Sequence, residues 1–374
     1  MISSHQPSAD SQRPAANSRQ PFKTCAFLKP LALVYEAVTF ARNSRYDKGA
    51  ASSFRADFPV ISIGNITAGG TGKTPHTEYL TRLLSGRYRI AVLSRGYGRR
   101  TKGYIEVSVG ANALQVGDEP LQMSRKFPDV TFAVCENRAE GLQRLTHSTH
   151  PDAVILDDAF QHRAVTPSLN ILLVNWNRNI MDDMVLPAGL LRESASGRRR
   201  ADIIIISKCP DNLSPGQMDI ERKRLQCSDS QKVFFSTMEY DGLVPFDASS
   251  PARSLNSITD RSSVIVATGI ASPGPIIREL SKRTADITPL TFSDHHSFND
   301  RDIARIGRAV SEARLSDKIV ITTEKDAARL QDMHISPELR RLIYILPVRV
   351  RLIDGQSDFD NIIINHIENF KKDR

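Results

Sequence analysis

The sequence predicts an α/β protein in which a doubly wound parallel sheet carries a phosphate-binding loop and a second, smaller α/β domain follows. Two observations lead to this fold class. Short, nearly continuous apolar runs alternate with helical stretches, which is typical of strands buried on both faces of a parallel sheet. A glycine-rich loop joins the first of these runs to a helical stretch. The length of 374 residues also favours two domains.

The N-terminal segment is expected to lie outside the sheets. Residues 1–21 are polar, lack the apolar core of a signal peptide and are predicted to be a disordered extension. Residues 22–45 are predicted to hold an amphipathic helix with basic flanks, which either contacts a membrane surface or docks on the first domain. No run reaches the ~18 apolar residues that a membrane-spanning helix needs. The apolar residues at helical spacing are Leu31, Val34, Tyr35, Val38 and Ala41.

The nucleotide-binding domain is predicted to span residues 46–225. Helical stretches at 75–85 and 138–145 fall between some of its strands. The sheet is doubly wound because apolar runs and helices alternate along the chain. The predicted strands are the runs at 60–63, 90–93, 131–134, 153–156, 171–174 and 203–206.

The smaller domain is predicted to span residues 226–350, and a tail helix is predicted within 351–374. The boundary lies in the polar, proline-containing stretch 208–232. Helices are expected at 275–283, 300–315 and 361–370. The predicted strands are the runs at 233–235, 264–267, 319–322 and 342–346.

The loop at residues 67–74, with the sequence TAGGTGKT, predicts nucleotide binding. Its glycines let backbone N–H groups point at phosphate oxygens, and the start of the following helix adds a partial positive charge. Lys73 can reach the β- and γ-phosphates, and the Thr74 hydroxyl can hold Mg²⁺. The first glycine of the usual motif is replaced by Thr67. The predicted nucleotide-binding residues are Thr67, Ala68, Gly69, Gly70, Thr71, Gly72, Lys73 and Thr74.

Acidic residues elsewhere complete the pattern of a phosphoryl-transfer site. Asp157 and Asp158 end a buried strand, as carboxylates that hold magnesium do, although aspartates are also common in turns. Asp118 and Glu119 form a second pair in a predicted loop, and either could accept the proton of an acceptor hydroxyl. In the SDHH segment at 293–296, a histidine could relay that proton, or the segment could cap a helix.

The amino-acid composition limits the classes of molecule that this protein is expected to bind. The net charge of +8 favours anionic partners, but aromatics make up only 6% of the chain, so a nucleic-acid-binding ATPase is disfavoured. Four separated cysteines argue against a zinc site or a disulfide framework and fit a cytoplasmic setting. The segment SKCPD at 207–211 places its acid one residue late for guanine recognition, which favours adenine. A P-loop ATPase that delivers a cargo stays open on these grounds.

Taken together, the motifs resemble the tetraacyldisaccharide 4'-kinase family, the lipid A 4'-kinases of Gram-negative bacteria. They occur in the family's order and cover residues 30 to about 350. The matching segments are SIGNITAGGTGKTP at 62–75, LSRGYGR at 93–99, GDEP at 117–120, DDAFQH at 157–162, LPAGLLRE at 186–193, FSDHH at 292–296 and TTEKD at 322–326.

The resemblance implies a P-loop kinase-like fold of two α/β/α domains with the site between them. It implies ATP with Mg²⁺ as donor, the 4'-hydroxyl of a tetraacylated glucosamine disaccharide 1-phosphate as acceptor, no nucleic-acid partner, and a peripheral place on the cytoplasmic face of the inner membrane. Asp118 would be the general base, assisted by His295, and Lys73 would act on the phosphates. The residues around the metal would be Thr74, Glu119, Asp157 and Asp158, and those elsewhere in the site Tyr97, Arg138, Gln161 and His162.

One position departs from the family pattern. The family usually has glycine where this chain has Ala159, directly after the acidic pair. Alanine tolerates fewer backbone conformations than glycine, so the backbone of this loop has less freedom here than in the family pattern.

Overall fold

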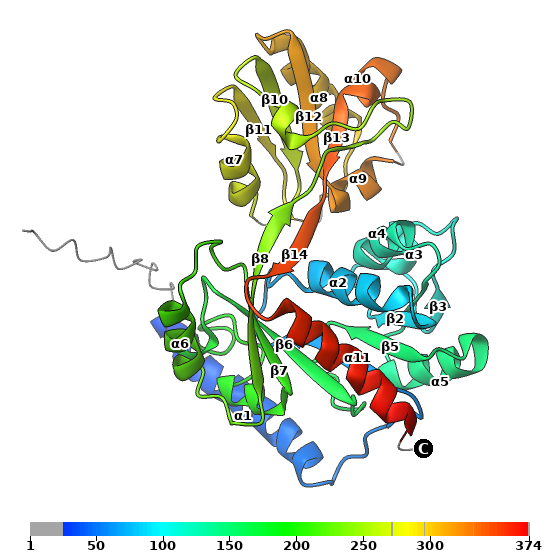
Figure 1. Cartoon of the computed structure of the whole chain (residues 1–374), viewed down its shortest axis with the longest axis vertical. Helices are drawn as coiled ribbons and strands as arrows, with labels where there is room; N and C mark the ends of the chain where they lie inside the picture. Colours follow the sequence, from blue (N-terminus) through cyan, green and yellow to red (C-terminus); the bar gives the residue numbers. More distant parts are fainter. Residues whose placement is uncertain (1–24, 271, 295, 332, 373–374) are drawn as a thin grey trace, which may run out of the picture.

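The computed structural model describes residues 25–270, 272–294, 296–331 and 333–372. They form a nine-stranded and a five-stranded sheet, both covered by helices (Figure 1). The larger sheet has the strand order β14-β8-β7-β6-β1-β5-β2-β4-β3. Its strands are β1 Val60–Asn65, β2 Ile90–Ser94, β3 Ile105–Glu106, β4 Thr131–Val134, β5 Ala153–Asp157, β6 Leu169–Asn175, β7 Ile203–Ser207, β8 Lys232–Tyr240 and β14 Val348–Leu352.

The smaller sheet has the order β11-β10-β12-β13-β9. All its pairings are parallel except that of β9 with β13. Its strands are β9 Val244–Pro245, β10 Ser262–Thr268, β11 Ile287–Thr291, β12 Asp317–Thr323 and β13 Ile343–Leu346. The α-helices of the described chain are α1 Lys29–Asp47, α2 Lys73–Ser85, α3 Ala113–Val116, α4 Asp118–Lys126, α5 Arg138–Thr149, α6 Pro215–Arg224, α7 Gly274–Leu280, α8 Asp300–Glu312, α9 Glu324–Leu330, α10 Pro337–Leu342 and α11 Gln356–Lys372.

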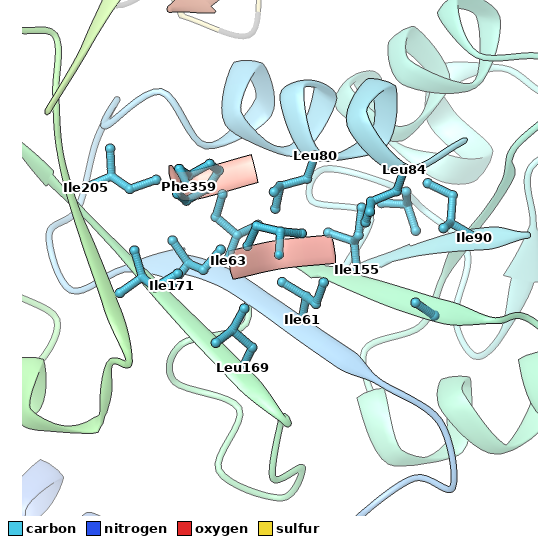
Figure 2. Packing of buried hydrophobic residues seen from close by; sticks show 14 of the residues in the cluster. Ile61, Ile63, Leu80, Leu84, Ile90, Ile155, Leu169, Ile171, Ile205 and Phe359 are labelled. Carbon is cyan, nitrogen blue, oxygen red and sulfur yellow. The ribbon is translucent and has the colours of Figure 1, made fainter. Parts of the chain in front are cut away.

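Helices cover both faces of the larger sheet. Alternate residues of β1 point to opposite faces, as the two-residue period of a strand requires. Ile61 and Ile63 pack in one cluster with residues of α2 and α11, among them Leu80 and Phe359 (Figure 2). The other face is packed by α1, α6 and α5. The smaller sheet is covered by α7 on one face and by α8 and α9 on the other. The predicted α/β/α architecture is therefore confirmed.

Parallel pairing places the functional loops at one edge of the larger sheet. Strand β1 lies between β5 and β6, and Ile63 of β1 is in register with Asp157 of β5. The loop after β1 and the acidic pair after β5 therefore leave neighbouring strands at their carboxyl ends. Ligands of open α/β sheets bind at this edge.

The strand predicted at 233–235 belongs to the larger sheet, not to the smaller one. Strand β8 pairs with β7 through its first residues and with β14 through its last ones. The chain thus crosses between the sheets at 241–243 and returns at 347 (Figure 1). Helix α11 then packs on the larger sheet, where the Phe359 ring lies edge-on to Phe234 and Tyr79. The reason is non-local: an apolar run shows that a strand is buried, but not which sheet contains it.

The division into one domain of residues 46–225 and another of residues 226–350 stays a prediction. Residues 1–21 and His295 lie outside the described residues. The predicted helix from Pro30 is confirmed as α1.

Candidate active site

The glycine-rich loop is held by side chains from strand ends. Asn65 Nδ2, at the end of β1, donates to Thr71 Oγ1 at 2.7 Å, and Ser207 Oγ, at the end of β7, donates to the Thr71 carbonyl at 2.7 Å. Gly72 has φ +84°, in the left-handed region that favours glycine, and a Cβ there would lie 2.4 Å from Met238 Cε. Lys73 and Thr74 follow in the first turn of α2, as predicted.

The segment LPAGLLRE at 186–193 lies beside this loop and is joined to it by backbone hydrogen bonds. Ala68 N–H donates to the Leu190 carbonyl at 2.6 Å, and Arg192 N–H donates to the Ile66 carbonyl at 2.7 Å. Arg192 Nη1 also lies 3.1 Å from Asp158 Oδ1. Sequence reasoning gave Arg192 no role, although its motif was among the family segments.

Lys73 reaches back to the acidic pair. Its Nζ lies 3.6 Å from Asp158 Oδ1. Burial alone would raise the pKa of Asp158, but the charges of Lys73 and Arg192 outweigh burial and lower it. Asp158 is therefore a carboxylate at neutral pH, with two cations beside it.

Asp157 has the opposite environment. It is buried and accepts a 2.9 Å hydrogen bond from Thr77 Oγ1. Burial raises its pKa to about 7, and the charges of Glu119 and Asp158 add to the rise. Glu119, in the first turn of α4, and Asp158 thus both contribute negative charge around Asp157. This concentration of negative charge fits a divalent cation.

The donor set also fits magnesium. Within the described residues, no group of three His, Cys, Asp or Glu side chains stands ready to hold a metal ion. Magnesium usually keeps several waters and takes only one or two protein carboxylates beside substrate phosphates. The oxygens of Asp157, Asp158, Glu119 and Thr74 are of the type that it prefers.

Arg138 and His162 lie beside the acidic pair. Arg138 is only 2% exposed, and its Nε and Nη2 find no hydrogen-bond partner among the described residues. Burial lowers its pKa to about 10, although Asp157 and Asp158 favour the charged form. Burial, followed by the charges of Arg138 and Arg95, lowers the pKa of His162 to about 4, so its imidazole is neutral at pH 7. Buried guanidinium N–H groups without partners suit an anionic ligand.

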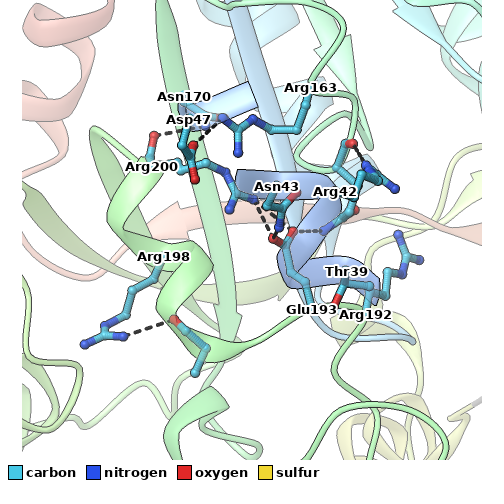
Figure 3. A network of polar contacts seen from close by, with 12 residues as sticks. Thr39, Arg42, Asn43, Asp47, Arg163, Asn170, Arg192, Glu193, Arg198 and Arg200 are labelled. Carbon is cyan, nitrogen blue, oxygen red and sulfur yellow. Dashed lines mark hydrogen bonds and ion pairs between the residues drawn. The ribbon is translucent and has the colours of Figure 1, made fainter. Parts of the chain in front are cut away.

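Gln161 has a supporting position. Its Nε2 donates to the Asn65 carbonyl at 2.8 Å and to Glu193 Oε1 at 3.0 Å. Figure 3 shows that Asn43 of α1 and Arg200 also converge on Glu193. Helix α1 is thus tied to the loops of the site through its inner face.

Asp118 begins α4 and forms an ion pair with Arg329 of α9, on the smaller sheet. Gly117, just before it, lies against the SRGYG loop, since a Cβ on Gly117 would be 2.9 Å from the Tyr97 carbonyl oxygen. Tyr97 itself is 73% exposed. The predicted partner of Asp118, His295, lies outside the described residues. Arg329 is a contact that sequence reasoning missed, and its only signal was its place three residues after the TTEKD motif.

The backbone conformation at Ala159 is one that alanine adopts readily. The residue with left-handed backbone is Asp158, with φ +48°, and Ala159 is not among the positive-φ residues. The Ala159 N–H donates to the Ile63 carbonyl at 3.3 Å, and its side chain is buried. Alanine is therefore compatible with this position.

Helix α1 carries exposed apolar side chains opposite its docked face. Ala32 is buried and Tyr35 OH donates to the Arg192 carbonyl at 2.9 Å, whereas Leu31, Val34 and Val38 are 59%, 63% and 64% exposed. Across the part of the chain that the structure describes, no helix combines the length and apolar character that crossing a membrane requires.

Comparison with known proteins identifies the family of this chain. The family model described as "Tetraacyldisaccharide-1-P 4'-kinase" matches residues 24–368. A tetraacyldisaccharide 4'-kinase of Bacteroides thetaiotaomicron is 43% identical over 355 residues, which is 91% of this chain and 93% of that protein. One from Parabacteroides distasonis is 42% identical over 347 residues, or 91% and 94% of the two chains.

A solved structure agrees as well. The crystal structure of LpxK from Aquifex aeolicus in complex with ATP superposes with a TM-score of 0.71 at 28% identity, covering 91% of this chain and 99% of that one. The P-loop kinase-like fold is thereby confirmed. The chain belongs to the tetraacyldisaccharide-1-P 4'-kinase family and is an ATP-dependent kinase of lipid A biosynthesis.

Proposed function

We propose that this kinase moves the γ-phosphoryl group of ATP onto the 4'-hydroxyl of a tetraacylated glucosamine disaccharide 1-phosphate, using the residues at the carboxyl edge of the larger sheet. The observation that carries the assignment of residues is the contact between the phosphate loop and the acidic pair: the Nζ of Lys73, in the first turn of α2, lies 3.6 Å from Asp158 Oδ1. A phosphate loop, a cation site and a separate carboxylate are the parts that phosphoryl transfer requires.

The nucleotide would lie along residues 67–74. Lys73 would contact the β- and γ-phosphates, and the partnerless N–H groups of Arg138 would face the oxygens of the transferring group. Asp157, Asp158, Glu119 and Thr74 would hold Mg²⁺. The ion neutralises charge that develops on the phosphate oxygens.

Asp118 would act as the general base, with His295 assisting. As the 4'-oxygen attacks the γ-phosphorus, its proton passes to the Asp118 carboxylate, and the bond from that phosphorus to the bridging oxygen of ADP breaks. The acidic pair suits this task less well, because its carboxylates would be ligands of the magnesium ion. Asp118 lies on α4, apart from the strand end that carries the pair.

Helix α1 would bring the site to its lipid substrate. Its inner face is fastened to the site through Asn43 and Tyr35, while its outer face offers Leu31, Val34 and Val38. An apolar helix face with basic residues nearby inserts into a membrane interface without spanning it. We infer a peripheral protein at the cytoplasmic face of the inner membrane, where ATP is available.

The test is transfer of labelled γ-phosphate to detergent-dispersed tetraacyldisaccharide 1-phosphate. We expect a lipid product phosphorylated at the 4'-position, whereas a cargo-delivering ATPase would release only free phosphate. A double-mutant cycle then tests the base. Asp118→Ala and His295→Ala should each lower kcat by roughly 10²-fold or more, and the double variant should lose much less than the product of the two. If the two losses of kcat multiply in the double variant, or if only the affinity for ATP falls, Asp118 and His295 do not share a role in proton transfer.

A further inference from the structure

The TTEKD motif at 322–326 and the helix it opens form a charged contact with α4. Three ion pairs cross this contact. Arg329 pairs with Asp118, Lys325 Nζ lies 3.6 Å from Glu119 Oε1, and Lys126 Nζ lies 2.6 Å from Glu324 Oε1. Helices α4 and α9 belong to different sheets and lie beside one another (Figure 1). None of the residues of this motif has a role in the proposed phosphoryl transfer.

Arg329 holds a single oxygen of Asp118 with two of its nitrogens. Its Nε lies 3.1 Å from Asp118 Oδ2, and its Nη2 contacts the same oxygen. The Arg329 side chain is only 8% exposed, so solvent screens this pair weakly. The planar guanidinium fixes direction as well as distance, which a lysine ammonium cannot do.

Arg329 is in turn held by Asp326. The Asp326 carboxylate is fully buried, and its Oδ1 lies 3.4 Å from Arg329 Nη1. It accepts hydrogen bonds from Thr323 Oγ1 at 2.7 Å and from the Gly269 N–H at 3.1 Å. Asp326 is therefore fastened to the ends of two strands, β12 and β10, of the smaller sheet.

Gly269, which follows β10, also lies close to the described residues of the FSDHH segment. A Cβ placed on Gly269 would lie 3.1 Å from the Ser293 carbonyl oxygen and 3.2 Å from both Asp326 Oδ1 and His296 Cβ. A side chain at this position would be tight, because its Cβ would require these groups to shift slightly. Asp326 thus contacts Arg329 on one side and lies close to this segment on the other.

We propose that Asp326 and Arg329 form a positioning relay that fixes the direction of the Asp118 carboxylate. The proposal rests on the proposed role of Asp118 as general base. Asp326 and Arg329 do not touch the reacting atoms in this account. They fix the angle at which Asp118 is presented, and small errors of angle are costly in proton transfer.

The other ion pairs of the contact provide the control. Lys126 and Glu324 join the same two helices but do not contact Asp118. If Arg329 only fastens the helices together, Glu324→Gln should have the same effect as Arg329→Gln. If Arg329 positions Asp118, Arg329→Gln should lower kcat much more than Glu324→Gln does.

The experiment measures kcat and the KM values for ATP and lipid in the full-length kinase. Arg329→Gln should lower kcat by about 10- to 100-fold with the KM for ATP within about twofold, because a positioning residue acts on the transition state. Arg329→Lys should recover little, and guanidinium ions at tens of millimolar should partly restore Arg329→Ala but not Glu324→Gln. Glu324→Gln should stay within about threefold of wild type.

A further arm separates this proposal from the proposed function. In an Asp118→Ala background, Arg329→Gln should cost less than about threefold, because its effect passes through Asp118. Equal losses for Arg329→Gln and Glu324→Gln, or a full loss in the Asp118→Ala background, would overturn the relay. Should Arg329→Gln fail to fold, as thermal unfolding would reveal, Arg329→Lys and Asp326→Asn carry the same comparison. A wild-type enzyme that does not phosphorylate the lipid, or an active Asp118→Ala variant, would instead refute the proposed function.

Discussion

Replacing Leu31, Val34 and Val38 with serine should release the kinase from membranes without harming its fold. These side chains are 59%, 63% and 64% exposed on α1, so most of their apolar area is available to a lipid surface. Full burial of such a side chain is worth about 1.5–3 kcal/mol. Scaling by the exposed fraction gives about 1–2 kcal/mol each, or about 3–5 kcal/mol for the three. At about 1.4 kcal/mol per tenfold, the affinity for vesicles should fall by roughly 10²- to 10⁴-fold.

The assay is co-sedimentation with vesicles that contain anionic phospholipid, at low and high salt. A matched control replaces Val109, Leu114 and Val244 with serine, since these are also exposed apolar residues but lie on other segments. The control should bind vesicles as wild type does, and both variants should keep their thermal unfolding midpoint within a few degrees. Binding of the α1 variant within about threefold of wild type, or equal weakening of the control, would refute a membrane role for this face.

Three further outcomes are expected. Lys73→Ala should lower phosphoryl transfer by roughly 10³-fold or more, and transfer within about tenfold of wild type would contradict its role. Burial lowers the pKa of His76 to about 4 from its ordinary 6.5, so its stabilising effect is complete above pH 6.5 and is lost as pH falls toward 4. His76→Gln should therefore reduce the slope of unfolding free energy against pH in that range by up to about 1.4 kcal/mol per pH unit; an unchanged slope would show that His76 does not titrate in this way. Phe359→Ala should cost about 3–5 kcal/mol in urea denaturation, because Phe359 anchors α11 in the main core, and a cost below about 1 kcal/mol would mean that α11 is dispensable.

The local parts of the site could be predicted because each is encoded by adjacent residues. A buried strand, three glycines and the pair Lys73–Thr74 form one continuous segment, and Asp157 is the last residue of another buried strand. Parallel strands end at a common edge, and the observed register of β1 and β5 brings these two segments together. The family resemblance then supplied the reaction. The amphipathic pattern of α1 left two alternatives, and the structure shows a docked inner face with an exposed apolar outer face.

The loop around Ala159 shows where local reasoning fails. The family pattern identified the alanine as the unusual residue, but the left-handed conformation belongs to Asp158, whose side chain contacts Lys73 and Arg192. Tertiary ion pairs thus stabilise a backbone conformation that a carboxylate residue adopts less readily than glycine.

By itself, the sequence determined the fold class, the phosphate loop, the acidic strand end and the family, because these follow from short-range patterns of residue type. Only the tertiary structure decided that β8 and β14 join the larger sheet and that Arg329 meets Asp118, 211 positions away along the chain. Hydrophobic periodicity reports that a strand or helix face is buried, but the choice of neighbour depends on sheet order and on how two sheets face each other. Those choices are settled by packing and charge pairing across the whole chain, so no window of sequence contains them.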